Sequence, residues 1–169
     1  MGFSVSDTTM RTRDRHRSGS RPQPLRPCSW PIEQLPGLSQ EDQTRLQDHG
    51  IHTTQQLLQQ AATPAQRQHL AAQLQIHVQH VNKWVALADL AKIPSVGCQY
   101  CGLLLHAGVA SCAQLAQTPL HRLHPQIMRL QVAMMQRPDL CPPIEAMAIW
   151  MQQARSLTAS SMLKTTESK

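Results

Sequence analysis

Two stretches of this sequence, LPGLSQEDQTRLQDHGIHTTQQLL (35–58) and IPSVGCQYCGLLLHAGVASCAQLA (93–116), align at an offset of 58 residues. No gap is needed over the 24 aligned positions. The alignment pairs Leu35 with Ile93, Pro36 with Pro94, Leu46 with Leu104, Gly50 with Gly108, Ile51 with Val109, and Leu57 with Leu115. An internal repeat of this kind indicates one supersecondary unit that the chain uses twice.

The local chemistry of each copy predicts two helices joined by a turn. A proline and an apolar residue make a tight turn, and a helix of about ten residues follows. Gly50 or Gly108 ends that helix in the left-handed conformation that glycine adopts most easily. Thr53 or Ser111 then caps the next helix with its hydroxyl group. Each unit therefore reads as turn, helix, turn, capped helix.

Composition favours an all-α protein. Hydrophobic residues make up 41% of the 169 residues, and aromatic residues only 3%. Gln, Leu and Ala, which favour helices, dominate the middle of the chain. A further helix ends each repeat and carries Trp84 or Trp150. We therefore expect one compact all-α domain over residues 31–157, built from repeat one (31–90) and repeat two (91–157).

The two ends of the chain have a different composition. Residues 1–30 contain six Arg and two Asp, a net charge of +4, with several Ser and Pro. This composition predicts a disordered basic arm, and residues 158–169 read as a disordered tail. No apolar run is long enough to span a bilayer, so we expect no membrane partner. Five cysteines in no scaffold-like spacing favour a reducing, cytoplasmic location.

The repeat resembles the helix-hairpin-helix superfamily, whose hairpin follows the pattern apolar-Pro-Gly-apolar-Gly. Its tandem layout is similar to an uncharacterised bacterial family of such domains, a "domain of unknown function" family found partly in photosynthetic bacteria. The resemblance covers about residues 31–157. It implies two degenerate helix-hairpin-helix units, and it carries fold information without an established activity. In the DNA-binding members, the hairpin amides and the following helix N-terminus hold a backbone phosphate.

This sequence departs from the phosphate-binding pattern in both hairpins. Ser39 replaces the second glycine in repeat one, and Glu41 and Asp42, which would repel a phosphate, follow it. Ser95 replaces the first glycine in repeat two, whereas Gly97 keeps the second. The second hairpin is therefore the better candidate. The proposed nucleic-acid-binding residues are Pro94, Ser95, Val96, Gly97, Lys92, Arg11, Arg13, Arg15 and Arg17.

Cys98 and Cys101 form a Cys-x-x-Cys pair, with His106 and Cys112 close behind. A redox site or a zinc site is one interpretation, because such pairs supply thiolates. The repeat favours another, since the first copy makes the same turn without a cysteine. We therefore expect a structural hairpin with no metal and no cofactor.

The segment MRLQVAMMQ (128–136) places Met128, Val132 and Met135 on one helical face. Core packing is one interpretation of this face. An adaptable Met-lined groove for a partner helix is the other.

No catalytic motif is present, and acidic residues are few, so we expect a protein that is not an enzyme. Residues 31–169 carry ten Lys and Arg against eight Asp and Glu, a net charge of +2. A nearly neutral folded part favours a protein-interaction adaptor. The alternative is sequence-independent nucleic-acid binding through the second hairpin and the N-terminal arginines. A thiol or zinc protein that uses Cys98 and Cys101 is a third hypothesis.

Overall fold

The computed structural model describes residues 24–166. Regular structure in this range is helical, apart from one isolated bridge between Pro31 and Thr53. The elements are η1 (Ile32–Gln34), α1 (Gln40–Asp48), α2 (Thr54–Gln60), α3 (Pro64–Leu74), α4 (Val78–Ala91), α5 (Gly97–His106), α6 (Cys112–Gln117), α7 (Leu120–Met135), η2 (Pro138–Leu140) and α8 (Ile144–Thr166). The all-α prediction is confirmed for this part of the chain.

The two repeats end their first helix in the same way. Gly50 follows α1 with φ of 79°, and Gly108 follows α5 with φ of 91°. In each copy the amide after the glycine donates back to a carbonyl in the last turn of the helix. These hydrogen bonds are Ile51 N to Leu46 O and Val109 N to Leu104 O, both 2.9 Å. A hydrogen bond of this kind across a left-handed glycine is typical of the Schellman motif, which satisfies backbone carbonyls that have no partner at the helix end.

The second helix of each repeat also begins in the same way. The Thr53 hydroxyl accepts from the Gln56 amide at 3.2 Å, and the Ser111 hydroxyl accepts from the Gln114 amide at 3.1 Å. Each glutamine Oε1 accepts in return from the amide two residues before its helix, at 2.8 Å in repeat one and 2.9 Å in repeat two. The sequence offset of 58 residues is thus reproduced in the hydrogen bonds.

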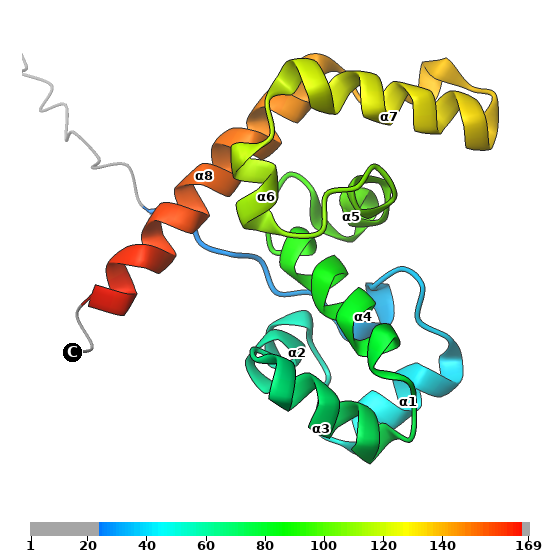
Figure 1. Ribbon diagram of the computed structural model, residues 1–169, viewed down its shortest axis with the longest axis vertical. Helices are drawn as coiled ribbons and strands as arrows, with labels where there is room; N and C mark the ends of the chain where they lie inside the picture. The colour runs from blue at the N-terminus through cyan, green and yellow to red at the C-terminus, as the bar shows by residue number, and fades with distance from the viewer. Residues whose placement is uncertain (1–23, 167–169) are drawn as a thin grey trace, which may run out of the picture.

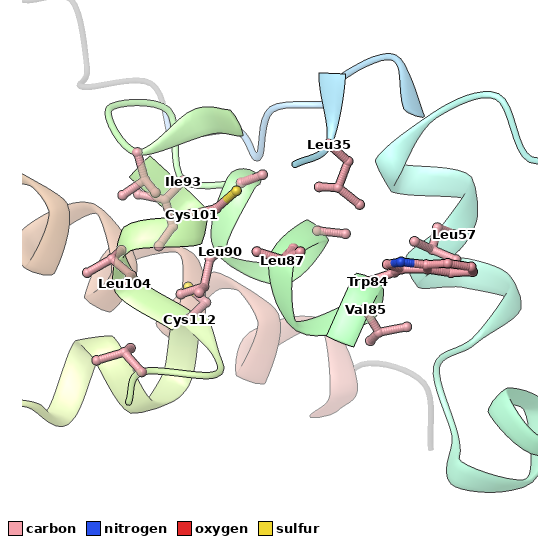
Figure 2. Packing of buried hydrophobic residues seen from close by; sticks show 14 of the residues in the cluster. Leu35, Leu57, Trp84, Val85, Leu87, Leu90, Ile93, Cys101, Leu104 and Cys112 are labelled. Carbon is pink, nitrogen blue, oxygen red and sulfur yellow. The ribbon is translucent and has the colours of Figure 1, made fainter. Parts of the chain in front are cut away.

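Helix α4 lies between the two halves of the molecule and packs against both (Figure 1). It contacts α2 and α3 on one side and α5 on the other. Figure 2 shows Trp84 lying against Leu57 of α2, whereas Leu90 points toward Leu104 and Cys112 of the second half. All five side chains are buried. One helix therefore joins both repeats into a continuous core.

Helix α8 plays the corresponding part in the second half, where it packs along α6 and α7. Its Trp150 is buried, and the centroid of that ring lies 4.9 Å from the centroid of Tyr100 in α5. Both tryptophans that mark the sequence repeat are therefore core residues.

The predicted boundary of the N-terminal arm is wrong at its end. Residues 24–30 run in an extended conformation against the domain (Figure 1). The Cys28 amide donates to the Lys92 carbonyl at 2.7 Å, and Trp30 Nε1 donates to the Ala91 carbonyl at 2.8 Å. An indole ring that can bury its carbons and pair its N–H has a strong reason to pack. The segment therefore joins the domain ahead of residue 31.

The predicted tail is also wrong for residues 158–166, which continue α8 as far as Thr166. Between Ile144 and Thr166 the sequence contains neither Gly nor Pro. Once a packed segment has nucleated a helix, each added residue gains a hydrogen bond at little cost. The polar composition of this segment reflects an exposed helix rather than a disordered tail.

Candidate functional site

The second hairpin, residues 92–97, is the candidate phosphate site, and its residues lie between α4 and α5. Lys92 is the C-cap of α4, and its ammonium group pairs with Asp89 one turn earlier. Val96 and Gly97 are buried, Ser95 is exposed, and Pro94 is half-buried. The five hairpin residues of the predicted nucleic-acid-binding set therefore lie together in the structure. Arg11, Arg13, Arg15 and Arg17 lie outside the described residues.

The backbone amides of this hairpin donate to groups within the chain. Both Val96 N and Gly97 N donate to the Ile93 carbonyl at 3.0 Å. Ser95 N donates to Gln153 Oε1 at 2.9 Å, and Gln153 Nε2 donates to Ser95 Oγ at 2.9 Å. A phosphate at this turn would have to displace these partners. These hydrogen bonds fit a structural role for the hairpin, which they attach to α8.

The ring of Trp30 covers the same hairpin. A Cβ atom built on Gly97 would lie 3.0 Å from Cζ2 of Trp30, so the ring lies against the glycine backbone. Gly97 has φ of 54°, which also disfavours any larger residue. Trp30 was not recognised as part of this site, although a tryptophan beside an otherwise polar arm is a usable signal for packing.

The first hairpin is open by comparison. Gly37 is exposed, and a Cβ atom built on it would lie 3.5 Å from Nζ of Lys83 in α4. Sequence reasoning missed this cation, because no local pattern joins two residues so far apart in the chain. Glu41 pairs with Arg45, and the Ser39 hydroxyl donates to Asp42 at 2.8 Å. The first hairpin thus presents one ammonium group beside a carboxylate-rich helix start.

The Cys-x-x-Cys pair lies in the first turns of α5. Burial raises the pKa of Cys98, and burial together with the neighbouring Cys98 raises the pKa of Cys101 to about 12. Cys101 is fully buried, and Figure 2 shows it within the core. Redox chemistry and zinc binding both use the thiolate, which this environment disfavours at neutral pH. The geometry fits the structural interpretation of the pair.

Cys112 is also a packed residue. Burial raises the pKa of its thiol, and the sulfur donates to the Ala154 carbonyl of α8 at 3.7 Å. Within residues 24–166, no three His, Cys, Asp or Glu side chains gather in a group that could hold a metal ion.

The outer end of α7, from residue 128 onward, and the following η2 extend past the body of the molecule (Figure 1). The side chains of Val132, Met134 and Met135 are 47%, 63% and 58% exposed, and Leu140 of η2 is exposed as well. Core packing therefore does not account for the Met-rich segment. We call these four residues the α7 apolar surface.

Residues 36–157 match the family model described as Domain of unknown function (DUF4332). The chain belongs to this family. Its domain begins in the first hairpin and ends at Leu157, which is buried in α8. Trp30 and the last turns of α8 lie outside the matched range, whereas both hairpins and the α7 apolar surface lie within it. No curated protein and no solved structure matches the chain.

The DUF4332 domain also contains an open cleft of about 690 Å³ between its two halves. Its polar lining comes from Arg67, Asn82, Asp89, Lys92, Ser111 and Ser161. The Asp89 carboxylate is already engaged, since it pairs with Lys92 and accepts from the Cys112 amide at 2.8 Å. The carboxylate therefore ties α4 to the start of α6.

No helix in the described part of the domain combines the length and the apolar character needed to cross a membrane.

Proposed function

We propose that this protein is a non-catalytic binding module, a protein-interaction adaptor that uses the α7 apolar surface. The observation that carries the proposal is the exposure of Val132, Met134 and Met135 on a helix end that extends past the core. Exposed apolar patches on a monomer are typical of interaction sites. Methionine side chains adapt to the shape of a partner, which suits an adaptor.

The sequence pattern within α7 supports this proposal. Leu123 and Ile127 face the body of the molecule and are buried. Met134 continues the same helical face, since it lies seven residues after Ile127, which is close to two helical turns. It is exposed because the C-terminal end of α7 extends beyond the elements that cover the earlier residues of the helix. A side chain with the pattern of a core residue but no cover is suited to receive a partner.

The experiment places a photo-crosslinking amino acid at Val132 of the full chain, in cells that normally produce it. A control places it at Met162, a more exposed apolar position on α8. We expect a defined protein to crosslink from position 132 and not from position 162. Equal crosslinking from both positions, or crosslinking to nucleic acid alone, would contradict the proposal.

Nucleic-acid binding is the second candidate, and one observation favours it. The ammonium group of Lys83 lies beside the exposed backbone of Gly37 in the first hairpin, where a phosphate oxygen could accept from it. Such binding would weaken steeply with salt, because counterions are released from the nucleic acid. A Lys83→Glu variant would lose it, whereas the protein adaptor would be unaffected.

We further infer that the two repeats are degenerate helix-hairpin-helix units and that the protein works in the cytoplasm. The positive φ of Gly37 and Gly97 at the two hairpins supports the first inference. The five free cysteines support the second, since thiols persist in a reducing compartment.

A further inference from the structure

Helix α7 carries a second apolar stripe besides the one that faces the core. Its members are Met128, Val132 and Met135, spaced by four and three residues. This is the spacing with which one helix packs against another in a coiled coil. The stripe lies about 100° around the helix from the buried stripe of Leu123 and Ile127. Its C-terminal part is available for docking, because Val132 and Met135 are 47% and 58% exposed, whereas Met128 is half-buried.

Positive charge lines one edge of this stripe. Arg122 and Arg129 are both exposed and lie seven residues apart, which is about 10.5 Å along a helix. Arg129 directly follows Met128, as a charged flanking residue of a coiled coil does. Arg122 lies one heptad earlier and follows His121, which occupies the position seven residues before Met128.

No carboxylate of α7 balances these two arginines. The sequence contains no Asp or Glu between Asp89 and Asp139. The Asp139 carboxylate is already paired with Arg137. Arg137 Nε donates to Asp139 Oδ1 at 2.9 Å, and Arg137 Nη2 donates to Asp139 Oδ2 at 2.7 Å. The edge formed by Arg122 and Arg129 therefore presents positive charge beside an apolar seam.

This charge pattern discriminates between occupants. A second copy of α7 would bring two more arginines and no carboxylate, and like charges across a helix pair destabilise it. A helix with carboxylates beside its seam would pair with both arginines. Opposite charges that flank a coiled-coil seam select the partner and its orientation.

We propose that the stripe docks an amphipathic helix of another protein, whose apolar seam is flanked by Asp or Glu residues seven positions apart. This inference rests on the proposed function and specifies the class of partner. The apolar seam supplies contact area, and the two arginines supply selectivity and a faster encounter.

The test uses a displayed library of amphipathic helical peptides with a fixed apolar seam and flanking positions that vary between Glu and Lys. The probe is the full chain, immobilised. We expect enriched peptides to carry Glu at flanking positions seven residues apart and to bind at least tenfold more weakly to an Arg122→Glu, Arg129→Glu variant. That variant should select Lys-flanked peptides instead, because the charges are exchanged.

Matched controls separate this inference from the proposed function. Lys164→Glu reverses an exposed charge on α8, and Met162→Asp changes an exposed apolar side chain there; neither should alter binding. The Val132→Asp, Met135→Asp variant should abolish binding while its circular dichroism stays unchanged. Enriched peptides that need Val132 and Met135 but show no preference for Glu would overturn the acidic partner and leave the adaptor standing. Peptides indifferent to Val132 and Met135, or no enrichment at all, would overturn both.

An anionic membrane is the competing occupant of a basic amphipathic helix. Vesicles of phosphatidylcholine and phosphatidylglycerol in equal parts provide the comparison. We expect the full chain to remain unbound to them at physiological salt. Sedimentation with these vesicles that is lost in the Val132→Asp, Met135→Asp variant would overturn the helical partner.

Discussion

The two hairpins align without a gap, yet the structure uses them differently. The first exposes Gly37, with the Lys83 ammonium group beside it. The second buries Gly97 under the Trp30 ring, and its Ser95 amide donates to Gln153. Sequence alone favoured the second hairpin for binding, because it lacks acidic residues. The contrast shows that a repeated motif keeps its turn while its surroundings decide whether the backbone is accessible.

The largest effect should come from core positions at which the repeats are equivalent. Leu46 and Leu104 align and are both fully buried. Leu46→Ala and Leu104→Ala should each lower the free energy of unfolding by about 3 kcal/mol, through lost contacts and a cavity. Urea denaturation of the full chain measures both. A cost below about 1 kcal/mol for one of them would show that its half lies outside the shared core.

Substitution of the hairpin glycines should have a different cost in the free energy of unfolding in the two repeats. Gly97→Ala should cost about 2 kcal/mol, because it combines left-handed backbone strain with a contact against Trp30. Gly37→Ala should cost about 1 kcal/mol, because only the strain applies and the nearest atoms belong to a flexible lysine.

A double-mutant cycle tests the role of the Trp30 ring. In a Trp30→Ala background, the cost of Gly97→Ala should fall toward that of Gly37→Ala, as measured by urea denaturation. Equal costs for the two glycines in the parent chain would remove the distinction between an open and a closed hairpin.

The link between the second hairpin and α8 should have a smaller effect. Gln153→Ala removes both hydrogen bonds to Ser95 and should cost about 1 kcal/mol in the free energy of unfolding. Gln152→Ala, at an exposed neighbouring position, is the matched control and should be neutral. Amide hydrogen exchange should also become faster at Ser95 in the Gln153→Ala variant alone. Unchanged exchange at Ser95 would show that its amide is protected in another way.

The effect of the buried thiol should be confined to alkaline pH. Burial raises the pKa of Cys101 to about 12, above its ordinary value of 9.0. The unfolded chain therefore loses this proton at a lower pH than the folded chain does, and stability falls as pH rises from about 9 toward 12. Cys101→Ala should flatten this decline in urea titrations between pH 8 and pH 10. An unchanged decline would assign the pH dependence to other groups.

Much of the fold follows from the sequence, because its signals are local. Gly50, Gly108, Thr53 and Ser111 each act on backbone within one helical turn, and all four behave as predicted. The candidate site follows less well, because it depends on contacts between distant residues. The approaches of Trp30 to Gly97 and of Lys83 to Gly37 leave no periodic signal in the chain.

The boundaries and the α7 surface show where pattern reasoning reaches its limit. The polar composition of residues 158–166 is compatible with both a tail and an exposed helix, and the adjoining packed turns of α8 select the helix. The spacing of Met128, Val132 and Met135 identified the stripe but did not decide whether it packs in the core or lies on the surface. Only the three-dimensional arrangement shows that the C-terminal end of α7 extends beyond the elements that pack against its first turns.

The central claim is that the α7 apolar surface binds a protein. Its most direct test is affinity capture with the full chain and with the Val132→Asp, Met135→Asp variant, with and without nuclease, at low and raised salt. The account predicts a defined protein that is retained by the full chain under all four conditions and lost from the variant. Recovery of nucleic acid alone, lost at raised salt and unaffected by the variant, would contradict it.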